Sequence, residues 1–277
     1  MKHVTLKDGE QVPALGLGTW HMGERDGRRM REIDALKAGL DLGLNLIDTA
    51  EMYGEGGAEV IVAKALAGRR DEVFVVSKVY PHNASYRGTL HACERSLKRL
   101  ETETIDLYLL HWRGSYALSE TIEGFEKLKE QGKIRHWGVS NFDAVDMAEL
   151  LATDGGESCV VNQVLYNLTE RGIEWDLLDH ARLNDIATMA YSPLAQGDLM
   201  GDETLRDIAE AHGATPAAVA LAWVMNQHRT MTIPKAASLE HVKQNAAALD
   251  VKLSREDLKL LDAAFPAPTG PSPLAIL

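Results

Sequence analysis

The most constraining feature of this 277-residue chain is a regular alternation of short apolar runs with longer segments of helical periodicity. The pattern predicts eight strands, at 14–20, 45–50, 73–79, 105–111, 134–140, 159–166, 186–194 and 230–236. It predicts helices after them, at 27–43, 57–68, 86–100, 119–132, 143–152, 175–185, 203–213, 215–227, 238–249 and 254–265. Several strands are apolar throughout, which is typical of parallel strands covered by helices.

Strands that alternate with helices in this way predict one α/β domain, a (β/α)₈ TIM barrel that spans residues 1–277. An N-terminal hairpin is expected over 3–13, with its turn at Asp8-Gly9. A Rossmann sheet is the rival fold, and it needs G-x-G-x-x-G after its first strand. The glycines at 16, 18 and 23 have the wrong spacing, so the barrel is preferred.

The composition excludes several classes of function. A net charge of −12 without a basic block argues against nucleic acid, although a few lysines at one pocket can still bind an anionic cofactor. The start lacks an apolar signal region and no apolar run approaches membrane length, so we expect a cytoplasmic protein with no membrane partner. Cys93 and Cys159 have neither disulfide nor metal-site spacing, so no metal is expected.

Titratable side chains follow three consecutive strands. Asp48, Lys78 and His111 stand where the second, third and fourth strands end, and Tyr53 lies in the loop after Asp48. Each alone has an ordinary interpretation, such as a turn residue, a solvated lysine or a capping histidine. The carboxyl ends of barrel strands share one face, so together these four residues predict an active site.

These residue types suit proton donation to a carbonyl oxygen. A tyrosine has a pKa of about 10, and an adjacent ammonium is expected to lower it. Asp48 would hold Lys78 beside Tyr53, and His111 would hold the carbonyl oxygen. No side chain delivers hydride, so a nicotinamide cofactor is required. A Schiff-base aldolase that uses Lys78 is an alternative within the same fold.

The chain resembles the aldo-keto reductases over nearly its whole length. The matching stretches are LGLGTW (15–20), NLIDTAEMYGEG (45–56), SKV (77–79), LHWRG (110–114), GKIRHWGVSNF (132–142), VNQVLYNL (161–168), AYSPLAQG (190–197) and IPKAASLEHVKQNAAAL (233–249). The resemblance implies a (β/α)₈ barrel, a catalytic tetrad of Asp48, Tyr53, Lys78 and His111, and NADPH or NADP⁺ as cofactor, with NADH as a weaker substitute.

Further roles are implied by the resemblance residue by residue. Ser140, Asn141 and Gln163 match residues that bind the nicotinamide carboxamide, and Tyr191 matches the aromatic residue that stacks on its ring. Residues that match the pyrophosphate loop are Ser192, Leu194 and Gly197, and those that match the adenosine end are Lys235, Ser238, His241, Gln244 and Asn245. Trp20 and Trp112 match apolar walls of the substrate pocket.

Two departures from the family pattern bear on specificity. Position 241 is commonly arginine, which grips the 2′-phosphate, and a histidine there predicts a smaller preference for NADPH over NADH. The loop after Trp112 and the tail 266–277 are short, which predicts an open pocket for small or varied aldehydes, ketones and dicarbonyls such as methylglyoxal. A monomer is expected. A catalytically weak NADP(H)-binding regulatory subunit is the alternative outside the enzymes.

Overall fold

The computed structural model describes residues 2–277. Eight parallel strands form one sheet in the order β10-β9-β8-β7-β6-β5-β4-β3. Their bounds are β3 Leu17–Gly18, β4 Leu46–Asp48, β5 Phe74–Val79, β6 Ile105–Leu110, β7 Ile134–Ser140, β8 Val161–Leu165, β9 Ala187–Tyr191 and β10 Thr230–Thr232. Every residue of β5 and β6 is buried, as expected for strands covered on both faces.

Contacts between the first and last strands close the sheet into a barrel. Leu15 pairs with Thr232, and Gly18 with Lys235, in two parallel bridges. A Cβ at Gly18 would lie 2.6 Å from the carbonyl oxygen of Ile233, so glycine is required for this close approach. The expected (β/α)₈ barrel is therefore confirmed.

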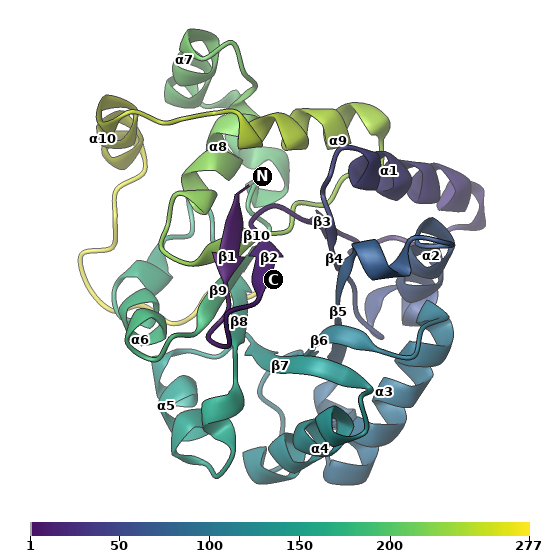
Figure 1. Cartoon of the computed structure of the whole chain (residues 1–277). Helices are drawn as coiled ribbons and strands as arrows, with labels where there is room; N and C mark the ends of the chain where they lie inside the picture. Colours follow the sequence, from purple (N-terminus) through teal and green to yellow (C-terminus); the bar gives the residue numbers. More distant parts are fainter. Residues whose placement is uncertain (1) are drawn as a thin grey trace.

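The helices form a ring outside the barrel (Figure 1). Their bounds are α1 Arg29–Asp41, α2 Gly57–Ala65, α3 Tyr86–Leu100, α4 Leu118–Glu130, α5 Ala144–Ala152, α6 Leu177–Leu183, α7 Glu203–Ala211, α8 Pro216–Met225, α9 Leu239–Ala246 and α10 Arg255–Ala264. None of these helices combines the length and the apolar character that crossing a bilayer requires.

Helix α4 begins earlier than the sequence pattern predicts. The helix was expected over 119–132, but it begins at Leu118, and its N-cap, Ala117, makes no side-chain capping bond. Leu118 is 4% exposed and packs in the core, so the first residue of the helix is buried by tertiary contacts.

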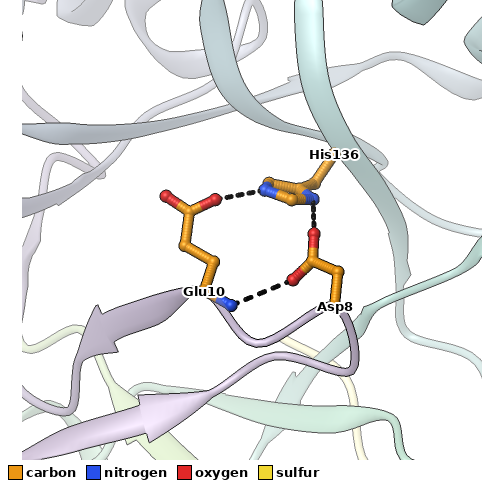
Figure 2. Close-up of side chains that lie close together, drawn as sticks. All are labelled: Asp8, Glu10 and His136. Atoms are coloured by element: carbon orange, nitrogen blue, oxygen red, sulfur yellow. Dashed lines mark hydrogen bonds and ion pairs between the residues drawn. The ribbon is translucent and has the colours of Figure 1, made fainter.

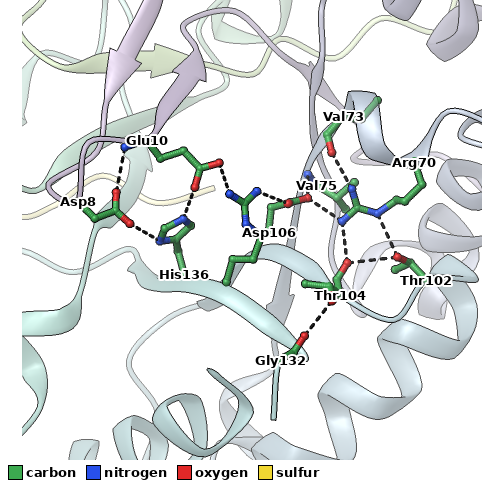
Figure 3. Close-up of polar contacts among 11 residues, drawn as sticks. Asp8, Glu10, Arg70, Val73, Val75, Thr102, Thr104, Asp106, Gly132 and His136 are labelled. Carbon is green, nitrogen blue, oxygen red and sulfur yellow. Dashed lines mark hydrogen bonds and ion pairs between the residues drawn. The ribbon is translucent and has the colours of Figure 1, made fainter. Parts of the chain in front are cut away.

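The predicted hairpin forms from β1 His3–Thr5 and β2 Gln11–Pro13. Ion pairs join the Asp8–Glu10 turn to the N-terminal end of β7, where Glu10 bonds both Arg135 (2.6 Å) and His136 (2.5 Å). Asp106 of β6 accepts hydrogen bonds from Arg135 and Arg70, which extends the network towards β5 (Figure 3). This network anchors the hairpin at the end of the barrel that is opposite the expected active site.

Candidate active site

The strand ends bring the four predicted catalytic residues together. Asp48 is the last residue of β4, Lys78 is the fifth residue of β5, and His111 follows β6 directly. Tyr53 begins the short 3₁₀ segment η2, Tyr53–Gly56, which returns the chain after Asp48 to the barrel mouth. Parallel strands end at one face, so residues far apart in sequence meet in one place.

Lys78 links the group. Its Nζ donates hydrogen bonds to Asp48 Oδ1 (2.7 Å), Asp48 Oδ2 (2.8 Å) and the carbonyl oxygen of Thr49 (2.9 Å). It also lies 3.1 Å from the Tyr53 hydroxyl. Lys78 is fully buried and Asp48 is 2% exposed, so solvent screens this pair little.

The direction of the Tyr53 pKa corrects one expectation. We expected Lys78 to lower it, but burial, with a smaller contribution from the Asp48 carboxylate, raises the pKa of Tyr53 well above its usual value. The physical reason is that the surroundings of Tyr53 solvate a phenolate poorly, and the Asp48 carboxylate repels its negative charge. Burial likewise lowers the pKa of Lys78, and Asp48 opposes this shift. Tyr53 is therefore a protonated hydroxyl at neutral pH, as a proton donor must be.

His111 is a neutral imidazole in this site. Burial, and then the positive charge of Lys78, lower its pKa well below the usual value. Its Nδ1 atom is buried without a hydrogen-bond partner among residues 2–277. The ring packs edge-on against Tyr53, with centroids 5.7 Å apart. A neutral imidazole carries one N–H, which suits it to hold a carbonyl oxygen rather than to protonate it.

A cavity of about 160 Å³ opens over the tetrad. Both predicted wall residues, Trp20 and Trp112, lie in its lining. The lining also contains Asp48, Tyr53, His111, Ser140, Asn141, Gln163, Tyr191, Ser192 and Lys235, together with Gly18, Met52 and Ile233.

The C-terminal tail contributes two residues to the wall of the catalytic cavity. Ile276 and Leu277 are part of the cavity wall, so the short tail does reach the active site. Residues 266–277 contain four prolines and have no helix or strand, and most of the segment lies beside Asp143, Arg171 and Asp176 before its last two residues reach the catalytic cavity. Ile276 and Leu277 remain 57% and 60% exposed, so this part of the cavity wall is in contact with solvent.

A second cavity of about 400 Å³ adjoins the first, and Trp20, Ser192 and Lys235 line both. Seven of the predicted cofactor residues line it, namely Ser192, Leu194, Gly197, Lys235, His241, Gln244 and Asn245. The backbone is strained here, because Ala195 and Gln196 have φ values of 45° and 55°. Strained left-handed residues of this kind cluster at ligand-binding loops.

Ser238 lies outside the lining of both cavities. Its hydroxyl instead accepts a hydrogen bond from the His241 backbone N–H and caps α9. The capped start of this helix lies near the second cavity, which His241 and Gln244 of α9 line. A helix N-terminus favours anions, so Ser238 has an indirect part in this site.

The predicted carboxamide residues are already bonded to one another. Asn141 Nδ2 donates to the His111 carbonyl (3.1 Å) and to Ser140 Oγ (3.2 Å), and its Oδ1 accepts from the Tyr191 hydroxyl (2.9 Å). Burial raises the pKa of Tyr191 to about 12, so this hydroxyl stays a donor. The contact that sequence reasoning missed is from Gln163 Nε2 to Asp48 Oδ1, at 2.8 Å.

Another polar cluster has metal-ligand residue types but different geometry. Asp8, Glu10 and His136 place candidate ligand atoms within 4.8 Å of one another. His136 Nδ1 faces Asp8 and its Nε2 faces Glu10 (Figure 2), so the two carboxylates lie on opposite sides of the ring. Each carboxylate already has a protein partner, so the cluster belongs to the network that joins the hairpin to β7.

Comparisons with known proteins show the family of this chain. The sequence profile of the aldo/keto reductase family matches residues 14–265. Methylglyoxal reductase YeaE of Escherichia coli (strain K12) is 52% identical over 99% of this chain and 98% of its own length. Glyoxal reductase of Bacillus subtilis (strain 168) is 38% identical over 94% of this chain and 91% of its own length.

A solved structure shares the whole fold. The aldo/keto reductase from Klebsiella pneumoniae in complex with NADP and acetate superposes with a TM-score of 0.97 at 50% identity, covering 100% of this chain and 99% of that one. The match of sequence profile, full-length relatives and structure has one conclusion: this chain belongs to the aldo/keto reductase family.

Proposed function

We propose that the protein reduces small aldehydes, ketones and dicarbonyls such as methylglyoxal with NADPH, and that Tyr53 donates the proton. The observation that carries this proposal is the position of Lys78 Nζ, within 3.1 Å of the Tyr53 hydroxyl and 2.7 Å of Asp48 Oδ1. A partly buried phenol that lies beside a cavity and contacts an ion-paired lysine is well placed to donate a proton.

The two adjoining cavities suit a dinucleotide cofactor. The first is lined by amide and aromatic side chains at Asn141, Gln163 and Tyr191, which suit a nicotinamide carboxamide and ring. The second has the cation Lys235, the imidazole of His241 and the start of α9, which suit phosphate groups. The Klebsiella pneumoniae relatives carry NADP and NADPH, which supports the same cofactor here.

The nicotinamide, when bound, supplies the hydride that the carbonyl carbon accepts. The chain does the remaining work. Neutral His111 donates its N–H to the carbonyl oxygen and orients it, and Tyr53 gives that oxygen its hydroxyl proton. Lys78 stabilises the negative charge that develops on Tyr53, and Asp48 keeps Lys78 in place.

Small carbonyl substrates are favoured by the size of the catalytic cavity. About 160 Å³ must hold the reacting carbonyl beside the nicotinamide ring. The relatives that act on methylglyoxal and glyoxal support the same substrate class. A panel of aldehydes and ketones tests this point, and a single bulky ketone that dominated the panel would contradict it.

Cofactor preference depends on His241. We propose that NADPH is preferred to NADH, by a smaller margin than an arginine at this position would produce, because an imidazole cannot bind a phosphate bidentately. Titration of the protein's fluorescence with each cofactor measures the margin. Equal dissociation constants for NADPH and NADH would refute the proposal.

The aldolase alternative is not supported by the position of Lys78. Its amine is fully buried, is held by Asp48 and Thr49, and is absent from the residues that line the catalytic cavity. A substrate carbonyl therefore meets Tyr53 first. The regulatory-subunit alternative predicts cofactor binding without turnover, so a turnover assay separates it from the reductase.

The decisive experiment compares wild type with Tyr53→Phe in NADPH oxidation with methylglyoxal and an aromatic aldehyde. The substitution removes one hydroxyl and little volume, so NADPH affinity is expected to survive. Turnover is expected to fall by at least ~10²-fold, the usual contribution of general acid catalysis. Comparable turnover in the two proteins would remove Tyr53 from the mechanism.

We also propose that residues 1–277 form a single domain and that the protein is a monomer in the cytoplasm. Cys93 and Cys159 are free and buried, and burial raises the pKa of each thiol to about 12. Unreactive thiols of this kind agree with a reducing compartment. Sedimentation measures the oligomeric state.

A further inference from the structure

Gln163 makes a contact that its expected role in cofactor binding does not explain. It belongs to β8, is 2% exposed, and lies four strands from Asp48 of β4 in the sheet order, on the far side of the barrel. Its Nε2 donates to Asp48 Oδ1 at 2.8 Å and also lies 2.9 Å from Met189 Sδ. The side chain therefore bridges the barrel interior to reach the tetrad.

Electrostatics determine which end of the Gln163 amide faces Asp48. An amide oxygen at 2.8 Å from a carboxylate oxygen would be repelled, whereas an N–H group is a good donor to it. Both N–H groups of Nε2 are then directed at Asp48 and Met189. The carbonyl oxygen of Gln163 is its remaining polar atom, and Gln163 belongs to the lining of the catalytic cavity.

The bond completes the support of the Asp48 carboxylate. Lys78 bonds both oxygens of Asp48, and Gln163 bonds Oδ1 from the opposite wall. A carboxylate held from two sides cannot turn without breaking a charge-assisted hydrogen bond. The orientation of Asp48 in turn decides whether Lys78 stays 3.1 Å from the Tyr53 hydroxyl.

We propose that Gln163 is a positioning residue for the proton donor: it fixes Asp48, and so Lys78 and Tyr53, from the wall where the nicotinamide carboxamide binds. The inference rests on the proposed reductase function. It gives one side chain two tasks, because its nitrogen anchors the tetrad while its oxygen remains as an acceptor for the cofactor amide. Seating of the cofactor and the geometry of the proton donor are thereby coupled.

Two substitutions separate these tasks. Gln163→Met keeps the length and removes both the donor and the acceptor. Gln163→Glu keeps the length and, while its carboxyl is protonated, can still donate to Asp48. Two carboxyl groups this close cannot both ionise readily, so the introduced acid is expected to hold its proton into the neutral range. Gln227→Met is the matched control, since Gln227 lies after α8, outside the lining of both cavities.

The measurement is turnover at saturating NADPH and methylglyoxal across pH 5 to 9, with NADPH dissociation constants from fluorescence. Loss of a hydrogen bond to a charged group predicts that Gln163→Met lowers kcat roughly 10- to 100-fold. In the pH profile of kcat for Gln163→Met, the fall at high pH is expected to move to lower pH, because a less fixed Asp48 stabilises the Lys78 ammonium less. Gln163→Glu is expected to approach wild-type kcat at low pH and to lose it as pH rises.

The positioning role is contradicted if the substitutions change only the affinity for the cofactor. If Gln163→Met weakens NADPH binding but keeps wild-type kcat and pH profile at saturation, or if Gln163→Glu shows no recovery at low pH, the positioning role is wrong. Such a result leaves the reductase proposal intact, since that fails only if wild type lacks turnover or Tyr53→Phe retains it. Thermal melting confirms that each variant is folded.

Discussion

Replacement of Lys78 by methionine tests the central feature of the site, the buried ion pair. Lys78 is fully buried, and methionine has a similar length and no charge. The change removes two hydrogen bonds to Asp48, of 2.7 and 2.8 Å, and leaves that carboxylate in the core with Gln163 as its remaining side-chain donor. Breaking a buried pair on one side costs about 3–5 kcal/mol of stability.

For a chain of this size, about 2 °C of melting temperature corresponds to 1 kcal/mol, so Lys78→Met is expected to melt roughly 6–10 °C below wild type. The free energy of unfolding in urea gives the same comparison directly. The double variant Asp48→Asn Lys78→Met leaves no unpaired charge at these two positions, so we expect it to be more stable than Lys78→Met although equally inactive. A single variant as stable as wild type, or a double variant less stable than Lys78→Met, would refute the reasoning.

Three further predictions concern the buried His111, the tail residues in the cavity wall and Glu10 of the hairpin. The pKa of His111 is lowered in the folded state, so the unfolded chain binds more protons than the folded chain below about pH 6.5. Wild type should therefore lose more stability than His111→Gln between pH 7 and 5, as measured by urea unfolding. The double variant Ile276→Ala Leu277→Ala should change the free energy of unfolding by less than about 0.5 kcal/mol, since both side chains are more than half exposed. It should raise kcat/KM for bulky aldehydes relative to methylglyoxal, because both side chains line the cavity. An unchanged ratio would show that the tail does not affect selectivity. Glu10→Gln should lower the free energy of unfolding by about 0.5–1 kcal/mol, because it weakens the hydrogen bonds to His136 and to the half-exposed Arg135, while kcat stays at the wild-type value.

Much of the fold could be predicted because its signals are local. Continuous apolar strands such as β5 and amphipathic helices between them are visible in short windows, and eight repeats admit few closed topologies. The tetrad could be predicted because the carboxyl ends of parallel barrel strands lie on one face of the barrel. The start of α4 was predicted wrongly at Ser119, since the burial of Leu118 depends on tertiary packing rather than on capping preference.

The features that escaped prediction all depend on distance through space. Nothing in the spacing of Asp48 and Gln163, 115 residues apart, indicates that they bond across the barrel. The tail has no periodicity, and only its path shows that Leu277 lines the cavity. The pKa of Tyr53 was predicted to fall, but its direction is a balance among burial, Asp48 and Lys78 that residue types alone cannot settle.

The amino-acid sequence by itself determined the barrel, the order of its strands and which residues stand at their chemical ends, because periodicity and strand polarity are properties of short segments. Tertiary structure alone decided how those ends act on one another. It places an ion-paired Lys78 beside Tyr53, a hydrogen bond from Gln163 on Asp48 and the end of the tail in the pocket wall. The physical reason is that Coulomb energies, burial and cavity shape depend on separations between atoms of different strands, which no local pattern encodes.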